Sequence, residues 1–470
     1  MRIRKVKNSA GNIVIQVGCY QGKHFKLVKH LGSAKNQAEE ESLFKQAHDF
    51  IYRNQLALFS PLSAITQDDI VPVGYSRDSA YRYFSDAFDC VFPKIRNRIV
   101  KDLVIIRIIH PASKLESVHL LSEYFGIKYA NTSVYRTFLK ADKQLFINQL
   151  ITYAKRQLNF DFTLLFYDVT TLYFESVSDG EFKIPGFSKD GRHSQPQILV
   201  GLIVDQHGFP VFYQIFKGNT FEGHTMLPII LEFKRAFKVK QLTIVADSAM
   251  LSEDNLSILE RHNLTYIVGN RTLSTYQNSL APEIQRLKLR DNSSCSIPQG
   301  QRQIVYHYSQ RREKKDWYEI EKAVTRAQYL AKNPSKRTKT KYLKVKAETI
   351  QVNQELIDKH KFLAGIKSYK TNSHLPPSLV VERYGDLWRI EKSFRMTKHD
   401  LKARPIFHRK EEAIQAHVLI VFAANAVSRY VELATNKPIR QLVKELMRVI
   451  DVKFKLRNSH EIYSFSLPPH

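Results

Sequence analysis

The chain has 470 residues, and its 72 lysines and arginines outnumber its 45 aspartates and glutamates, which gives a formal net charge of +27 at pH 7. The length allows roughly two to four domains around a large core, and a hydrophobic content of 43% excludes a mainly disordered chain. So strong a positive charge favours a polyanionic partner, most often nucleic acid, with an anionic membrane surface as the lesser alternative.

The cysteines and the apolar runs bear on cellular location. Cys19, Cys90 and Cys295 are far apart and odd in number, which argues against a disulfide framework or a zinc cluster. The apolar run 13–17 is too short for the core of a signal peptide, and the longest run, 416–427, is too short to cross a bilayer. We therefore expect a cytoplasmic protein without a membrane partner.

The N-terminal third is predicted to hold two regions. Residues 1–75 begin with strand-like alternation and turn signals, which predict a β-hairpin followed by a helix near 36–58. Residues 76–158 have the apolar spacing of helices. We expect the second region to be mainly helical and to bind DNA.

This helical region contains a candidate helix-turn-helix. A helix near 113–124 ends at Gly126, and Asn131 or Thr132 can cap a second helix. Apolar residues of both helices would form the shared core: Leu120, Leu121, Ile127, Val134, Phe138 and Leu139.

The second helix would then be the one that enters the major groove. Its first turns carry Tyr135 and Arg136, which are the candidate DNA-contacting residues. Because helix–Gly–helix patterns are common, an ordinary helical pair is an equally open alternative.

From residue 159 the pattern changes to that of a mixed α/β sheet, which we expect over 159–271. One apolar strand carries a single acid, Asp168, in its middle, and a second short strand ends in Asp247. A buried carboxylate without a partner is costly, so Asp168 should have a metal, a cation or a hydrogen-bond network beside it.

Basic segments dominate residues 272–355. The run 311–318 is strongly basic, and lysines alternate with aromatic residues over 334–346. Such a surface suits phosphates and exposed bases, although a charge run is more often only a solvated face. Trp317 in this region is expected to be a buried core residue rather than a stacking platform.

The region 356–470 is expected to return to the sheet and to continue in helices. Tyr384, Glu391 and Lys398 are seven residues apart on a predicted helix, and seven steps of about 100° place them along one stripe. An acid between a phenol and an ammonium suits a polyanion site, and a coincidence on a solvated face is the alternative.

Asp168, Asp247 and Glu391 are the three acids at informative places, on two strands and one helix. Only the fold can bring them together, because they are far apart in sequence. Three clustered carboxylates repel one another, and Mg²⁺ relieves that repulsion while keeping positions for water and phosphate. The predicted metal site and the basic surface both indicate that the substrate is the backbone of a nucleic acid.

An ordered set of motifs over 160–430 resembles a known family. The chain is similar to bacterial insertion-sequence transposases with Asp-Asp-Glu (DDE) chemistry, of the group with a Tyr-Arg-Glu-Lys signature. The resemblance implies a ribonuclease-H-like core interrupted by a β-rich insertion at about 272–355. The motifs that carry it are F-Y-D-V-T-T-L-Y-F-E, G-F-S-K-D-G-R, G-L-I-V-D-Q-H-G-F-P, F-K-G-N-T-F-E, I-V-A-D-S-A-M-L-S-E-D-N and Y-G-D-L-W-R-I-E-K-S-F-R-M-T-K.

By this resemblance Asp168, Asp247 and Glu391 are the catalytic triad, and they bind two Mg²⁺ ions, for which Mn²⁺ can substitute. The implied reaction is cleavage at the element's ends followed by attack of the freed 3′-hydroxyl on target DNA. The implied partners are double-stranded DNA, as terminal inverted repeats and as target, and a second copy of the chain. The implied location is the bacterial cytoplasm at the nucleoid.

The signature also assigns Tyr384 and Lys398 to contacts with the DNA end, but its arginine is missing. The expected position holds Leu387, and the nearest arginines are Arg383 and Arg389. Arg389 is two positions away, about 200° around a helix, so it cannot simply replace the missing side chain.

Three rival functions stay open. The same three acids would serve a ribonuclease-H-like nuclease that cuts without strand transfer. A catalytically silent DNA-binding protein descended from a transposase is disfavoured because all three acids are present. A zinc protein using His193, His207 and His224 is least favoured, since their spacing matches no compact ligand motif.

Overall fold

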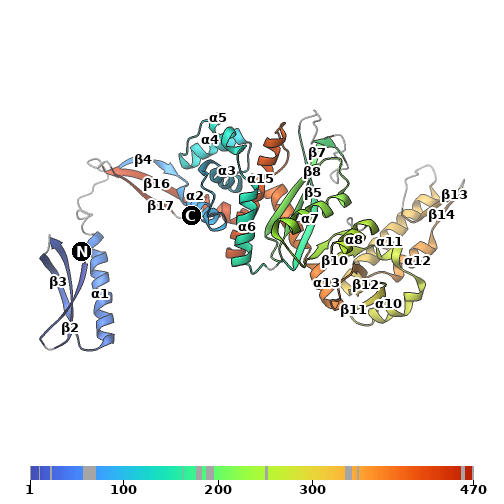
Figure 1. Ribbon diagram of the computed structural model, residues 1–470, viewed down its shortest axis with the longest axis horizontal. Coiled ribbons are helices and arrows are strands. Elements are labelled where there is room, and N and C mark those ends of the chain that lie inside the picture. The colour runs from blue at the N-terminus through green and yellow to red at the C-terminus, as the bar shows by residue number, and fades with distance from the viewer. Residues whose placement is uncertain are drawn as a thin grey trace. The chain divides into compact units, whose positions relative to one another are not determined.

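The computed structural model describes residues 2–9, 11–21, 24–56, 70–160, 162–175, 183–186, 195–248, 252–333, 341–346, 349–456 and 461–467. The described residues form two compact units (Figure 1). One unit contains residues 1–76 and 450–468, and the other contains 77–449.

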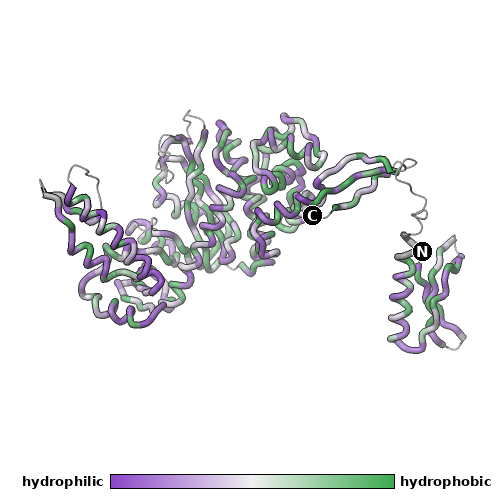
Figure 2. The backbone as a smooth tube through the Cα atoms, turned by 180° about the vertical axis from the view of Figure 1, so that it is seen from behind, coloured by the Kyte–Doolittle hydropathy of each residue, from purple (hydrophilic) through white to green (hydrophobic). Residues whose placement is uncertain are grey.

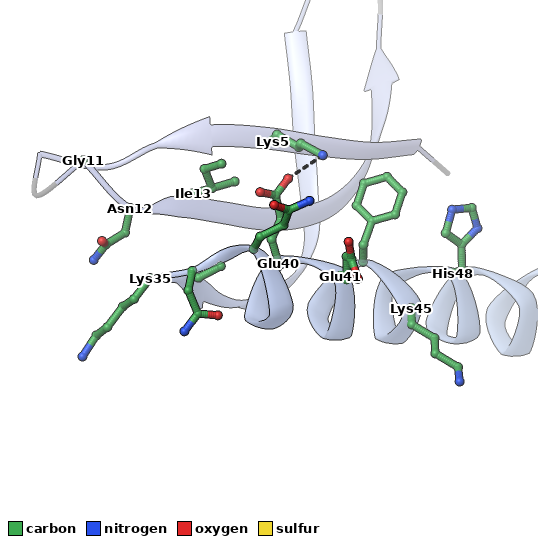
Figure 3. Close-up of a pocket in the computed structure, with 13 residues that line it drawn as sticks. Lys5, Gly11, Asn12, Ile13, Lys35, Glu40, Glu41, Lys45 and His48 are labelled. Atoms are coloured by element: carbon green, nitrogen blue, oxygen red, sulfur yellow. Dashed lines mark hydrogen bonds and ion pairs between the residues drawn. The ribbon is translucent and has the colours of Figure 1, made fainter.

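The smaller unit begins with a three-stranded antiparallel sheet covered by helix α1, Gln37–Leu56. Ile15 and Val17 of the sheet are fully buried against Ala47 of the helix. Lys5 and Glu40 join sheet and helix by an ion pair of 2.6 Å (Figure 3). The sequence predicted a two-stranded hairpin, whereas the structure has three strands, which the two turn signals separate. The strands are β1 (Arg2–Lys7), β2 (Ile13–Gln21) and β3 (His24–Ala34).

A second sheet of this unit joins the two ends of the chain. Strand β16, Ile450–Leu456, lies between β4, Ile70–Ser76, and β17, Ile462–Leu467, and all pairings are antiparallel. The last region, predicted to continue in helices, therefore ends in two strands that the prediction did not include. Their alternating apolar and polar residues have the period of a strand rather than of a helix.

The larger unit begins with five helices, which confirms a mainly helical region. Gly126, at φ +68°, ends α4 in the left-handed conformation that glycine adopts readily, and α5 begins at Asn131. The cap residue of α5 is Ala130, so the expected side-chain cap is wrong, and Leu139 is 44% exposed rather than in the shared core. The helices are α2 (Asp78–Val91), α3 (Arg98–Ile109), α4 (Lys114–Phe125), α5 (Asn131–Phe138) and α6 (Lys143–Gln157).

A nine-stranded mixed sheet forms the centre of the larger unit, and it confirms the predicted α/β fold class with a ribonuclease-H-like core. Strand β5 is antiparallel to β7 on one side and parallel to β9 on the other, and β9 is parallel to β10. The sheet runs in the order β11-β12-β15-β10-β9-β5-β7-β6, with β8 paired to β7. The core strands are β5 (Leu164–Tyr173), β6 (Ile184–Pro185), β7 (Pro196–Val204), β8 (Pro210–Lys217), β9 (Thr243–Ala246), β10 (Thr265–Asn270) and β15 (Ile366–Thr371).

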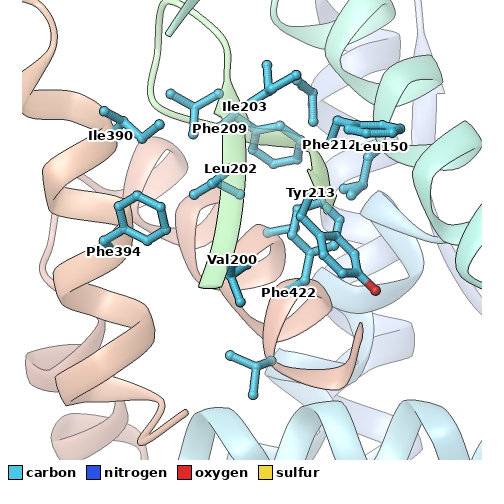
Figure 4. Packing of buried hydrophobic residues seen from close by; sticks show 14 of the residues in the cluster. Leu150, Val200, Leu202, Ile203, Phe209, Phe212, Tyr213, Ile390, Phe394 and Phe422 are labelled. Atoms are coloured by element: carbon cyan, nitrogen blue, oxygen red, sulfur yellow. The ribbon is translucent and has the colours of Figure 1, made fainter. Parts of the chain in front are cut away.

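Helices cover both faces of this sheet. Phe212 of β8 packs on Phe233 of α7, whereas the next residue, Tyr213, packs on Phe422 of α15, because successive side chains of a strand point to opposite faces. Figure 4 shows Ile390 and Phe394 packing on the second of these faces, and Figure 2 shows hydrophobic stretches running through the sheet and its covering helices. The covering helices are α7 (Met226–Phe237), α8 (Glu253–Arg261), α13 (Pro377–Gly385), α14 (Trp388–Arg395) and α15 (Glu411–Thr435).

Helix α15 is, among the described residues, the one helix long and apolar enough to cross a membrane, and 78% of its apolar window is buried. Its buried residues run from Ile414 to Glu432, so it is a core helix of the larger unit. Helix α16, Ile439–Leu446, follows it.

The segment expected to be a β-rich insertion is instead mixed, and part of it extends the core sheet. Strands β11 and β12 continue the sheet through β15, and the longest element is helix α11, Gln310–Lys332. The basic run lies on this helix because Ile320, Ala327 and Leu330 recur at helical spacing and bury one side of it. Residues 334–340 of the second basic run lie outside the described residues. The other elements are α9 (Thr272–Thr275), α10 (Ala281–Lys288), β11 (Ser294–Gln299), β12 (Arg302–Tyr308), β13 (Leu343–Lys346), β14 (Thr349–Val352) and α12 (Gln354–Phe362).

Candidate active site

Strand register brings the two predicted aspartates together. Tyr167 of β5 pairs with Ala246 of β9 in parallel. Asp168 and Asp247 are the residues that follow this pair, so they lie side by side where β9 ends. Asp168 is half-buried and Asp247 is exposed.

Side-chain alternation shows which face of the sheet Asp168 occupies. The hydroxyl of Tyr167 donates to Thr225 Oγ1 at 2.7 Å, on the side of α7. Asp168 therefore points to the opposite face, together with its cross-strand partner Leu202. Leu202 lies beside Ile390 of α14 (Figure 4). The helix that carries Glu391 thus packs on the same face of the sheet as Asp168.

Tyr384 connects α13 to Asp247. Its hydroxyl donates to Asp247 Oδ1 at 3.3 Å, and the backbone N–H of Ser248 donates to the same oxygen at 2.6 Å. Burial raises the pKa of the Tyr384 phenol, and the negative charge of Asp247 raises it further. The phenol is therefore a protonated donor at neutral pH, and it holds one oxygen of Asp247 in place.

A glycine makes room for this contact. A Cβ atom at Gly269 of β10 would collide with the Tyr384 hydroxyl, so the residue must lack a side chain for the hydroxyl to approach. Tyr369, opposite Gly269 in β15, packs its ring on that of Tyr384 with the centroids 4.6 Å apart. The position of the Tyr384 hydroxyl is thus fixed by the packing around it.

Lys367 of β15 lies close to two of the predicted acids. Its ammonium is 4.4 Å from the centroid of the Tyr384 ring. Burial lowers the pKa of Lys367 and Arg312 lowers it further, whereas the carboxylates of Asp247 and Glu391 raise it. An ammonium near both carboxylates reduces their mutual repulsion.

The regular stripe expected for Tyr384, Glu391 and Lys398 is wrong. Leu387 N–H bonds to Tyr384 O and Arg389 N–H bonds to Asp386 O, three residues back in both cases, so a tight turn separates α13 from α14. A π-helical segment, Met396–Asp400, follows α14. Both irregularities change the rotation per residue, and as a result Tyr384 is only 6% exposed while Glu391 is exposed.

A buried leucine, Leu387, occupies the position where the signature has its arginine. Leu387 is 7% exposed and belongs to the main hydrophobic cluster. The nearby Arg389 donates to Asp386 Oδ1 at 3.0 Å, which holds it away from the missing arginine's place. Arg312 on α11 and Lys367 are the basic residues that sequence reasoning missed here. No local signal singles out Lys367, because β15 is not an apolar strand and carries a second lysine, Lys370.

The predicted DNA-contacting residues outside the sheet are accessible. Tyr135 is 37% exposed and Arg136 is exposed on α5, while Lys398 is half-buried. Trp317 is 36% exposed, with Lys361 Nζ 5.4 Å from its ring, so its predicted burial is wrong. These contacts with DNA stay predictions.

The donor chemistry suits a divalent metal. Within the described part of the chain, no three His, Cys, Asp or Glu side chains form a group that could hold a metal ion, and His193 lies outside that part. Asp168, within β5, and Asp247, just after β9, nevertheless offer carboxylate oxygens from neighbouring strands, which hard cations such as Mg²⁺ prefer. Glu391 is exposed on α14, so the core does not hold its side chain.

Comparison with known proteins identifies the family. Residues 159–425 match the family model of the transposase DDE domain. Among solved structures, the chain is similar to a cryo-electron-microscopy structure of the piggyBac transposase synaptic complex with hairpin DNA, at 11% identity and a TM-score of 0.37, over 84% of this chain and 74% of that chain. No curated protein matches the chain at a significant level. Because the family model spans more than half of the chain, this protein belongs to the family of transposases with a DDE domain.

Proposed function

We propose that this protein is a DNA transposase that cuts the ends of an insertion sequence and joins the freed 3′ ends to target DNA. The observation that carries the proposal is the placement of Asp168 and Asp247 side by side at the end of β9, inside the segment that matches the transposase family. Glu391 lies in the same matched segment, on the helix that packs on their face of the sheet. The strong net positive charge suits a DNA substrate.

Asp168, Asp247 and Glu391 would together hold the metal, which we propose to be two Mg²⁺ ions with Mn²⁺ as a substitute. When bound, such ions activate an attacking oxygen and stabilise the leaving oxygen of a phosphodiester. Among the described residues, both donors to Asp247 bind Oδ1. Its Oδ2 is therefore left to serve as a ligand.

The chain's own residues have two further roles in this proposal. Tyr384 orients Asp247, since a hydroxyl in a packed, 6% exposed side chain is a better positioning group than a direct phosphate contact. Lys367 supplies positive charge beside Asp247 and Glu391, where the DNA backbone would pass, and Arg312 adds charge near Lys367.

Contacts away from the acids would position the DNA. Lys398 would bind a phosphate at the element's end, and Tyr135 and Arg136 of α5 would contact the duplex. For Lys398→Ala we expect weaker binding with a salt dependence shallower by about one unit of slope. An unchanged slope would place Lys398 away from the DNA. Two ends must be handled together, so we also propose that two copies of the chain act as a homodimer on inverted repeats.

The test is a strand-transfer assay with the full-length protein, the element's terminal DNA and a target plasmid. The terminal DNA is found by sequencing the flanks of the gene for inverted repeats. Joined products support the proposal, cleavage without joining supports a nuclease, and binding without cleavage supports a catalytically silent protein. Asp168→Asn, Asp247→Asn and Glu391→Gln should each abolish joining while binding is kept.

Matched controls come from acids outside the site. Asp86 on α2 and Glu382 on α13 are exposed, and neither belongs to the proposed site. Asp86→Asn and Glu382→Gln should therefore leave joining unchanged. Retained joining in any one of the three site variants would remove that acid from the site.

A further inference from the structure

A cavity of about 310 Å³ lies in the larger unit, away from the three acids. It is enclosed by the end of α3, the start of α4, part of α5 and the segment that leads into α15, which gather in one part of Figure 1. None of the described residues that line it is an aspartate or a glutamate. Six of its lining residues are basic: Arg107, Lys114, Lys402, Arg404, His408 and His417.

Arg107 is buried with part of its guanidinium unsatisfied. It is 4% exposed, and its Nη1 donates to the carbonyl oxygens of Leu401 and Lys402 at 3.5 Å each. Its Nε is buried and has no hydrogen-bond partner among the described residues. A charged group with an unmade hydrogen bond is costly to bury, so the site favours an acceptor that supplies the missing bond.

Lys114 is buried beside Arg107 without an acid to neutralise it. It is 4% exposed, and its ammonium lies 5.1 Å from the centroid of the Phe138 ring. Within the described ranges it forms no ion pair with a carboxylate. Burial lowers the pKa of Lys114, and the charge of Arg107 lowers that pKa further. Two buried cations that repel each other destabilise the fold unless an anion joins them.

Helix α4 adds to the positive character of the cavity, and two histidines line it beside the cations. The rings of His408 and His417 are 5.4 Å apart, and His417 Nε2 donates to Ala403 O at 3.0 Å. Helix α4 has twelve residues and begins at Lys114, after its cap residue Ser113. The positive end of its dipole therefore lies at the wall of the cavity.

We propose that this cavity is a binding site for a phosphate group. A buried guanidinium and a buried ammonium without acids exclude a metal ion and favour a compact anion with several acceptor oxygens, which phosphate provides. The volume exceeds the roughly 30 Å³ of one water molecule about tenfold, so a phosphate fits with ordered water. The site does not depend on the proposed transposase activity.

The phosphate has two conceivable sources with the same chemistry. A backbone phosphate of DNA bound along α4 and α5 is one, since the exposed Tyr135 also lines the cavity. Free inorganic phosphate is the other. The two differ in whether DNA binding depends on the buried cations.

The first experiment measures the melting temperature of the full-length protein in inorganic phosphate and in chloride of equal ionic strength, together with calorimetric titration of phosphate. Phosphate should raise the melting temperature of the wild-type protein. Lys114→Met should melt higher than wild type without phosphate, because a buried unpaired charge is gone, and should lose the rise that phosphate causes. Lys240→Met, at an exposed lysine, is the matched control and should keep the rise in melting temperature that phosphate causes.

A second variant tests the phosphate site independently, in case Lys114→Met does not fold. Arg107→Lys keeps the charge but removes the planar fork, and it should weaken phosphate binding at least about tenfold. The two sources are then separated with duplex DNA. A salt slope shallower by about one unit in Lys114→Met assigns the site to a backbone phosphate, and an unchanged slope with lost phosphate binding assigns it to the free ion.

The inference is overturned if phosphate stabilises the wild-type protein no more than chloride does while the DNA slope is also unchanged. It is equally overturned if Lys114→Met binds phosphate as tightly as the Lys240→Met control.

Discussion

The hydroxyl of Tyr384 donates to the carboxylate of Asp247 across 137 residues of sequence, at 3.3 Å. This single contact ties the start of the glutamate-bearing helical segment to the end of strand β9. In our proposal this contact orients a predicted metal ligand, and the contact of Tyr384 with DNA stays a prediction.

Tyr384→Phe removes the hydroxyl and keeps the packed ring. A net hydrogen bond is worth about 1 kcal/mol, so we expect the rate of strand transfer to fall about fivefold while the affinity for the DNA end stays within about twofold. Gel-shift and strand-transfer assays on the same preparation measure both quantities. Tyr318→Phe on the exposed part of α11 is the control. Weakened DNA binding at an unchanged rate of strand transfer would instead support a direct contact between Tyr384 and DNA.

Gly269→Ala tests the same contact from the opposite side. The added Cβ would collide with the Tyr384 hydroxyl, so overpacking should destabilise the protein by about 1–3 kcal/mol. In the double variant Gly269→Ala, Tyr384→Phe the hydroxyl is gone, and most of that loss should be recovered in urea denaturation. Gly385→Ala is the control, because a Cβ there meets no atom within 4 Å. Equal destabilisation in the single and double variants would show that the hydroxyl does not occupy this position.

Lys367→Met removes the ammonium near Asp247 and Glu391. A unit charge a few ångströms away contributes on the order of 1 kcal/mol in a largely hydrated site. Divalent-cation binding, measured by Mn²⁺ electron paramagnetic resonance, should therefore tighten severalfold, while Lys361→Met beside Trp317 should leave it unchanged. A looser Mn²⁺ site in Lys367→Met would mean that the lysine supports the metal rather than competes with it.

The buried histidines predict acid sensitivity in phosphate-free buffer. Burial, and after it the charges of Lys114 and Arg107, lower the pKa of His408 from 6.5 to about 4. The unfolded chain therefore takes up more protons between these values, and stability should fall as the pH drops from about 6.5 to about 4. His408→Gln should flatten this part of the curve of melting temperature against pH, and the exposed His374→Gln should not. If melting temperature falls equally with pH in both variants, His408 is not the group responsible for the acid sensitivity.

Local patterns were sufficient for the strands that carry the acids. Asp168 and Asp247 stand out because each interrupts or ends an apolar strand, and a parallel sheet then places them side by side. The prediction that Tyr384, Glu391 and Lys398 form one stripe was wrong, because a tight turn precedes Trp388 and a π-helical segment follows α14. Neither irregularity can be detected from the spacing of apolar residues.

Long-range packing could not be predicted from the sequence. Lys367 becomes informative only when β15 lies beside β10 and α13 covers them. Arg107 bonds to carbonyls 294 and 295 residues away, so the cavity around it exists only in the folded chain.

The central claim is that Asp247 binds the metal used in DNA strand transfer. The most direct test is Asp247→Cys, because a thiolate binds Mg²⁺ poorly and accepts softer ions. We predict that this variant joins no DNA in Mg²⁺ and regains joining when Mn²⁺ is supplied with a trace of Cd²⁺, while Asp247→Asn stays inactive in both. Full joining by Asp247→Cys in Mg²⁺ alone would contradict the claim.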